Sequence, residues 1–259
     1  MKKIAVITGA SSGFGKEFVK QIDKLHLDEI WAIARDKGKF DLLAKEISTP
    51  FKFYCLDLTK QESIKQYKQL LDKEKPDITW LVNCAGFGKF GRYDEIPLEE
   101  SVNMTELNCI ALVKMTELSL PYMHEGGRIV QIASVAGYQP IPYMAIYAAT
   151  KAYVVSYSRA LNVELKPRKI SVTCVCPFWS ATNFFNRAKI TKQEVVTKYV
   201  AMYQPQDVVK TAMKHALKRK EISIHGFKAR NQVRLVKLLP HKLVMKIWCK
   251  QQKMQRKYK

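Results

Sequence analysis

Three polar side chains stand in an order that suits proton transfer. Tyr147 and Lys151 are four residues apart in a stretch of helix length, which puts both on one helix face about a turn apart. A free tyrosine has a pKa of about 10, and a neighbouring cation lowers it. Ser134 precedes Tyr147 by 13 residues and directly follows an apolar run. A Tyr/Lys pair alone is more often an ordinary pair on a helix surface, so it is the added Ser134 that favours a catalytic site.

A glycine-rich segment, Thr8-Gly9-Ala10-Ser11-Ser12-Gly13-Phe14-Gly15, joins the first apolar run to the first amphipathic stretch. Glycines at such a junction let the backbone approach a pyrophosphate, and the free N–H groups at the start of the helix hold the anion. The alternative is an ordinary tight turn. The position between a predicted strand and a predicted helix favours a dinucleotide site.

The end of the second apolar run bears on the choice of cofactor. Arg35 offers a fork of donors suited to the 2′-phosphate of NADP. An acid at this place would instead bind the ribose 2′-hydroxyl of NAD, and a shift of one residue would put Asp36 there. We predict NADP as the preferred cofactor, with NAD as the alternative.

The elements that must position these residues alternate along the chain. Nearly continuous runs of Val, Ile and Ala indicate parallel strands with helices on both faces. The predicted strands are Lys3–Thr8, Glu29–Ala34, Phe51–Leu56, Thr79–Asn83, Arg128–Ala133, Ile170–Cys176 and Glu221–Ile224. The predicted helices are Gly13–His26, Lys37–Ile47, Lys60–Lys73, Leu98–Met123, Ala145–Lys166 and Pro205–Lys218. This predicts an α/β fold with a doubly wound, Rossmann-like parallel sheet, in which residues 1–225 form the catalytic domain and 226–259 a basic helical extension of it.

The loop spacing G-x-x-x-G-x-G and the order Ser134, Tyr147, Lys151 resemble the short-chain dehydrogenase/reductase family over roughly residues 3–182. Further positions match in sequence order: Asp57, the segment Asn83-Cys84-Ala85-Gly86, Asn108, Pro177 and Thr182. Two positions depart from the family pattern. Cys84 replaces a second asparagine, and Phe178 replaces a glycine where the backbone is expected close to the cofactor.

The resemblance implies an oxidoreductase that moves a hydride between a nicotinamide and a carbonyl or alcohol carbon. It implies that Ser134 hydrogen-bonds the substrate oxygen and that Tyr147 transfers its proton. It further implies that Lys151 lowers the tyrosine pKa and binds the nicotinamide ribose, and that Asn108 holds a water leading to solvent. No metal ligand is predicted. The predicted cofactor-binding residues are Gly9, Ser11, Ser12, Gly13, Phe14, Gly15, Arg35, Asp57, Leu58, Asn83, Ala85, Gly86, Tyr147, Lys151, Pro177 and Thr182.

Aromatic residues gather in loops near the expected mouth of the site: Phe87, Phe90, Tyr138, Tyr143, Phe178, Trp179, Phe184 and Phe185. They either wall an apolar pocket or cap the core. The pocket interpretation favours a bulky apolar substrate, such as a hydroxysteroid or a long-chain compound, over a small polar sugar. The resemblance also implies a homo-oligomer, a dimer or tetramer built through the helices 98–123 and 145–166.

Charge is concentrated at the end of the chain. The formal net charge is +21, and residues 214–259 hold 15 of the 44 basic residues and a single acid, Glu221. Leu243, Val244, Ile247 and Trp248 fall on one face of a helix that follows Pro240. We expect this face to dock on the domain or on another subunit. An anionic membrane surface is the second interpretation, and nucleic acid, without a recognition motif, is the least supported.

Two observations bear on location. The six cysteines (Cys55, Cys84, Cys109, Cys174, Cys176 and Cys249) show neither a C-x-x-C pair nor metal-ligand spacing. No apolar run approaches the roughly 20 residues of a membrane span, and the first residues lack the apolar stretch of a secretory signal. We predict a cytoplasmic protein with at most a peripheral membrane contact. The alternative function is a non-catalytic cofactor-binding or membrane-surface protein that acts through its basic tail.

Overall fold

The computed structural model describes residues 1–188, 196 and 198–253. In this part of the chain seven strands form one parallel sheet in the order β3-β2-β1-β4-β5-β6-β7. The strands are β1 (Lys3–Thr8), β2 (Glu29–Ala34), β3 (Phe51–Cys55), β4 (Asp77–Asn83), β5 (Arg128–Ile132), β6 (Ser171–Val175) and β7 (Ile222–Ser223). The predicted doubly wound sheet is confirmed, and its order reverses between β1 and β4.

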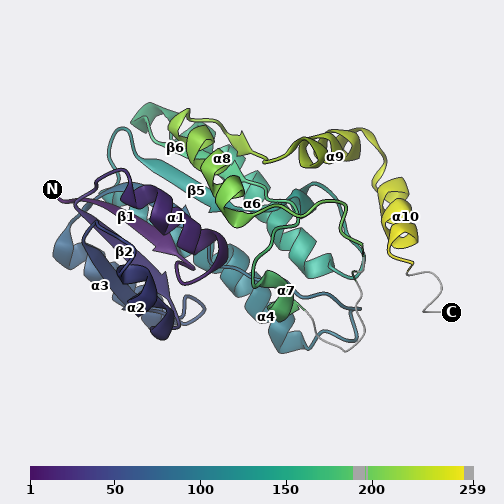
Figure 1. The fold of residues 1–259 in the computed structure, drawn as a ribbon, viewed down its shortest axis with the longest axis horizontal. Coiled ribbons are helices and arrows are strands. Elements are labelled where there is room, and N and C mark those ends of the chain that lie inside the picture. Colours follow the sequence, from purple (N-terminus) through teal and green to yellow (C-terminus); the bar gives the residue numbers. More distant parts are fainter. Residues whose placement is uncertain (189–195, 197, 254–259) are drawn as a thin grey trace.

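Helices cover both faces of the sheet (Figure 1). On one face lie α1 (Gly13–Asp23), α2 (Gly38–Ala44) and α8 (Pro205–Leu217); on the other lie α3 (Gln61–Glu74), α5 (Leu112–Ser119) and α6 (Ala145–Glu164). Strand β1 shows why both faces are covered, because successive side chains of a strand point to opposite faces. Ala5 and Ile7 pack against the side of α1, α2 and α8, whereas Ile4 and Val6 pack against the side of α3, α5 and α6.

The segment predicted as one helix over Leu98–Met123 is interrupted in the structure. It runs as α4 (Leu98–Thr105), a π-helical turn over Glu106–Ala111, α5, and a 3₁₀ turn over Leu120–Tyr122. The π-helical turn carries the side chain of Asn108, which hydrogen-bonds the backbone of Phe87. Turns of this kind cluster at functional sites.

The extension at the end of the chain forms two helices, α9 (Phe227–Leu238) and α10 (His241–Gln251), which Pro240 separates. They extend away from the sheet (Figure 1). The predicted apolar face of α10 is split. Val244 and Trp248 are buried against the domain, and the indole N–H of Trp248 donates to the Pro142 carbonyl at 3.1 Å, whereas Leu243 and Ile247 are 43% and 40% exposed.

Two further predictions concern features of the whole chain. All six cysteines are free, and the Sγ atom of Cys174 in β6 lies 3.7 Å from that of Cys176, the residue that follows the strand. Among the described residues no helix has the length and apolar composition needed to cross a membrane.

A buried polar cluster joins β4, β5 and α5. Asn83 and Gln131 pair across the two strands, and each donates a side-chain hydrogen bond to the Thr116 hydroxyl, at 2.9 and 3.0 Å. That hydroxyl in turn donates to the Leu112 carbonyl at 2.7 Å. All these side chains are buried, so none of the bonds is replaceable by water.

We predict that Thr116→Val, which keeps the shape but removes the hydroxyl, lowers the free energy of unfolding by about 2–3 kcal/mol, because two buried amides lose their acceptor. Urea unfolding followed by circular dichroism measures the loss. The matched control is Thr105→Val, since Thr105 makes the same local bond, to the Ser101 carbonyl, on an exposed surface. Equal losses in the two variants would contradict the prediction.

Candidate active site

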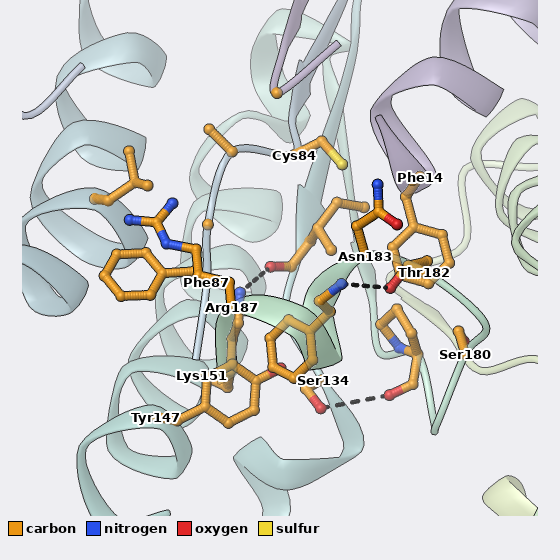
Figure 2. A pocket seen from close by; sticks show the side chains of 18 of the residues that line it. Phe14, Cys84, Phe87, Ser134, Tyr147, Lys151, Ser180, Thr182, Asn183 and Arg187 are labelled. Carbon is orange, nitrogen blue, oxygen red and sulfur yellow. Dashed lines mark hydrogen bonds between the residues drawn. The ribbon is translucent and has the colours of Figure 1, made fainter. Parts of the chain in front are cut away.

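A cavity of about 700 Å³ opens at the carboxyl ends of the strands, within the ~300–1,000 Å³ usual for small-molecule sites. Segments that follow β1 to β6 all contribute to its wall, as expected for a parallel sheet whose strand order reverses at its centre. They are Gly9 and Ser11–Phe14, Arg35–Asp36, Leu56–Leu58, Cys84–Phe87, Ala133–Ala136 and Pro177–Ser180. Figure 2 shows part of this wall from close by.

Ser134, Tyr147 and Lys151 meet at this wall, as the sequence predicts (Figure 2). Ser134 follows β5 in extended conformation, and its hydroxyl accepts from the Ala136 N–H at 3.1 Å and donates to the Pro177 carbonyl at 3.4 Å. Tyr147 lies in the first turn of α6. One turn later, the Lys151 ammonium lies 5.7 Å from the centre of the Tyr147 ring and donates to the Ile132 carbonyl at 2.8 Å.

Burial controls the ionisation of this group. Desolvation raises the pKa of Tyr147 to about 12, and the hydrogen bond with Ser134 opposes this only in part. Burial likewise lowers the pKa of Lys151. Burial is therefore the dominant influence on the Tyr147 pKa in the protein by itself, because a buried phenolate is costly. The expected lowering of this pKa by Lys151 stays a prediction. At neutral pH the phenol keeps its proton and is a proton donor.

Asn108 lies behind the cavity wall. Its side-chain oxygen accepts from the Phe87 N–H at 3.0 Å, and its amide donates to the Phe87 carbonyl at 2.8 Å and to the Thr150 hydroxyl at 3.1 Å. These bonds tie the segment after β4 to α6, so Asn108 positions the helix that carries Tyr147. Its implied role as holder of a water beside Lys151 stays a prediction.

The glycine-rich loop fits the dinucleotide that the resemblance implies. Gly9 has a left-handed φ of +66°, and a Cβ there would lie 3.0 Å from the Ala85 backbone. At Gly15 a Cβ would lie 2.1 Å from the Gly9 carbonyl oxygen. Only glycine permits these approaches, which leave bare backbone and the positive end of α1 facing the cavity.

The far end of the cavity carries the groups that bear on the cofactor. Arg35 is exposed there. At Asp57, burial favours a higher pKa, but hydrogen bonds from Thr59 and the charge of Arg35 outweigh it, so the pKa is lowered and the carboxylate stays ionised. Asp36 also lines the cavity, while its carboxylate accepts from the Gly38 N–H at the start of α2, at 3.1 Å.

Three predicted site residues do not line the cavity. Gly15 packs against Gly9. Asn83, the last residue of the central strand β4, donates a hydrogen bond to Thr116, and Asn108 hydrogen-bonds Phe87 and Thr150. The other predicted residues do line it, including Leu58, Ala85, Gly86, Pro177 and Thr182.

Aromatic side chains form one wall, and the prediction for them holds in part. Phe87, Phe178, Trp179, Phe184 and Phe185 line the cavity, whereas Phe90, Tyr138 and Tyr143 do not. Phe90 packs edge-on against Trp179 and Phe184. Phe178, where the family has glycine, is buried and narrows the site on this side.

Several residues that line the cavity were not predicted from the sequence: Leu107, Gln139, Ile141, Met144, Asn183, Arg187, Gln232 and Trp248. The Arg187 guanidinium stacks 3.6 Å from the centre of the Phe87 ring (Figure 2). Trp248 comes from α10 and lies 97 residues after Lys151 in the sequence. The apolar periodicity of α10 marked it as buried but held no sign of the cavity it would reach.

Comparison with known proteins agrees with this geometry. The family described as short chain dehydrogenase matches residues 3–193. The very-long-chain 3-oxoacyl-CoA reductase of Bos taurus is 33% identical over 220 residues, which cover 81% of this chain and 67% of that protein.

Two solved structures resemble the chain over most of its length. A short-chain dehydrogenase from Sphingobium yanoikuyae, in complex with NADPH, is 28% identical with a TM-score of 0.76, covering 91% of this chain and 94% of that one. A bulky-bulky ketone specific alcohol dehydrogenase from Comamonas testosteroni is 25% identical with a TM-score of 0.73, covering 92% of each chain.

Proposed function

The chain belongs to the short-chain dehydrogenase/reductase family of NAD(P)-dependent oxidoreductases, and from that membership we propose that it uses NADP to interconvert a secondary alcohol and a ketone on a bulky, apolar substrate. One observation carries the proposal. Ser134, Tyr147 and Lys151 meet in a cavity with bare backbone at one end and an aromatic wall at the other.

The chain's own residues handle the proton. When bound, the nicotinamide supplies the hydride that reduces the carbonyl carbon. As the carbonyl oxygen gains negative charge, the Ser134 hydroxyl donates a hydrogen bond to it and Tyr147 transfers its phenolic proton to it. The Lys151 ammonium, 5.7 Å from the centre of the ring, then stabilises the phenolate that remains.

We predict that Tyr147→Phe lowers kcat for ketone reduction by about 10²–10⁴-fold, because the proton donor is lost. Binding of the cofactor, followed by its fluorescence, should change little. Tyr93→Phe, at an exposed position outside α6, is the control.

The raised pKa of Tyr147 sets the pH dependence of the two directions. Since the phenol is protonated below about pH 12, reduction should keep its rate from neutral to mildly acidic pH. Oxidation needs the phenolate, so its kcat should rise steadily with alkaline pH. An oxidation rate that is already maximal at neutral pH would contradict the raised pKa of Tyr147.

The preference for NADP is supported by the exposed Arg35 at the cavity and by the Asp36 carboxylate, which bonds the backbone of α2. We predict that Arg35→Ser weakens NADPH binding by roughly 10- to 100-fold, the loss of one or two charge-assisted hydrogen bonds, and leaves NADH binding nearly unchanged. Fluorescence titration measures both, with Lys65→Ser on α3 as the control. Tighter binding of NADH than of NADPH to the unmodified protein would overturn the preference.

The substrate class is supported by the aromatic wall and by Trp248, which closes it from α10. Two relatives act on large substrates by name: a very-long-chain 3-oxoacyl-CoA reductase and a bulky-bulky ketone specific alcohol dehydrogenase. Hydroxysteroids and long-chain 3-oxo compounds are the two groups we would test first. Good turnover of small polar ketones with none of either group would overturn the proposal.

We predict that Trp248→Ala lowers kcat/KM for a bulky apolar ketone by roughly 10-fold or more, since a large apolar contact is lost, while small ketones are affected far less. Trp248→Phe should keep most of the selectivity. Ile247→Ala, the exposed neighbour on the same helix, is the control. An equal loss for bulky and small ketones would indicate damage to the fold rather than a lost wall.

We propose further that the protein is a homo-oligomer through α6. The exposed face of its first three turns is uncharged and consists of Ala145, Ile146, Ala149, Ala152, Tyr153 and Ser156, since Lys151 points inward. Such a face suits a subunit interface. Tyr153→Glu should lower the molar mass measured by light scattering after size exclusion, whereas Lys65→Glu on α3 should not. An unmodified protein that is monomeric at micromolar concentration would contradict this.

A further inference from the structure

The outer side of α9 and α10 combines exposed apolar and basic side chains, which we call the tail surface. Its apolar members are Phe227, Leu235, Leu238, Leu243 and Ile247, each at least 40% exposed. Its basic members are Lys228, Arg230, Arg234, Lys237, Lys242, Lys246, Lys250 and Lys253, all exposed. Both helices lie at one end of the molecule, away from the sheet (Figure 1).

Each helix has two apolar sides with different surroundings. In α9, Ala229, Val233 and Val236 are buried against the domain. At about 100° per residue, Phe227 and Leu238 fall on the opposite side. Leu238 is 81% exposed, more than most apolar side chains of the described residues. Docking on the domain therefore explains only the inner side.

The same division holds in α10. Val244 and Trp248 face the domain, whereas Leu243 and Ile247 lie one turn apart in solvent. Lys242, Lys246 and Lys250 follow one another at the same interval and form a basic row beside them.

The charge of the tail surface is not neutralised by the protein. The sequence has no acid after Glu221, and within the described residues none of the eight basic side chains forms a salt bridge. Lys237 instead lies 4.8 Å from the centre of the Tyr138 ring. A partner for this surface must offer many negative charges together with apolar volume.

We propose that the tail surface binds the surface of an anionic phospholipid membrane, with Phe227, Leu238, Leu243 and Ile247 entering the headgroup region. Basic side chains are attracted to the negative charge of such a surface, and apolar ones add to the binding by leaving water. A second copy of the chain would bring like charges together. Nucleic acid would satisfy the charges but leave the apolar residues in water.

The two helices would also bring a bound membrane close to the cavity. Gln232 of α9 and Trp248 of α10 line the cavity with their inner sides, so a membrane bound at their outer sides lies next to its apolar end. This step rests on the proposed function, because it supposes an apolar substrate that partitions into lipid; the membrane contact itself does not.

The test is co-sedimentation of the full chain with vesicles of phosphatidylcholine alone and of equimolar phosphatidylcholine and phosphatidylglycerol, at low and at physiological salt. We expect binding to the anionic vesicles only. The triple variant Lys242→Gln/Lys246→Gln/Lys250→Gln should weaken it by roughly 100-fold. Leu243→Ser/Ile247→Ser, which keeps every charge, should weaken it by roughly 10-fold.

Matched controls make the same changes elsewhere on the surface. Lys65→Gln/Lys73→Gln/Lys166→Gln removes three exposed lysines, and Val102→Ser/Val163→Ser removes two exposed apolar side chains; both should bind as the unmodified protein does. Circular dichroism and NADPH titration of each variant confirm that the fold persists. Absence of binding to anionic vesicles at low salt overturns the proposal.

A second result overturns it in favour of nucleic acid: duplex DNA or RNA bound as tightly as the anionic vesicles, with the lysine variant weakened and the Leu243/Ile247 variant unchanged. The link to the cavity is tested separately. Long-chain ketones dissolved in anionic vesicles should be reduced more slowly by the two tail variants, while a small water-soluble ketone is reduced at the unmodified rate. If the tail variants no longer bind vesicles but reduce the vesicle-borne ketone as fast as the unmodified protein, the link to the cavity is overturned while the proposed activity stands.

Discussion

Where β1 and β4 end side by side, the Thr8 hydroxyl accepts hydrogen bonds from the backbone N–H groups of Cys84 and Ala85, both at 3.0 Å. The contact brings the two loops so close that Gly9 has no room for a side chain. From this point the strand order runs to opposite edges of the sheet, so the connecting loops diverge and a gap opens between them. The remaining site elements are arranged around that gap.

Burial gives the site its chemical character. Tyr147 and Lys151 are both removed from water, which raises the pKa of Tyr147 and lowers that of Lys151. At neutral pH Tyr147 therefore keeps its proton, while the Lys151 side chain donates a hydrogen bond to the Ile132 carbonyl. Asn108, in its π-helical turn, fixes the neighbouring segment to α6 by bonds to Phe87 and Thr150. The positions and the ionisation of Tyr147 and Lys151 are thus controlled by residues that surround them.

The inner and outer sides of α9 and α10 have different surroundings. Its inner side completes the apolar wall with Trp248, whose indole is held by the Pro142 carbonyl. Its outer side carries unneutralised charge and exposed apolar residues, the basis of the proposed membrane contact. Under the two proposals, this pair of helices would both select the substrate and hold the protein at the membrane from which the substrate comes.

The sequence by itself determined the strands and helices, the phosphate loop, and the trio Ser134, Tyr147 and Lys151. These depend on local periodicity and short spacings, which the parallel sheet then gathers at one edge. Only the tertiary structure decided that Asn83 and Gly15 stand behind the cavity, that the Leu98–Met123 helix is interrupted, and that Trp248 reaches the wall. It also decided that Tyr147 is buried, which raises the pKa of its phenol. The reason is that desolvation and wall contacts arise between residues far apart in the chain, where neither spacing nor composition specifies the partner.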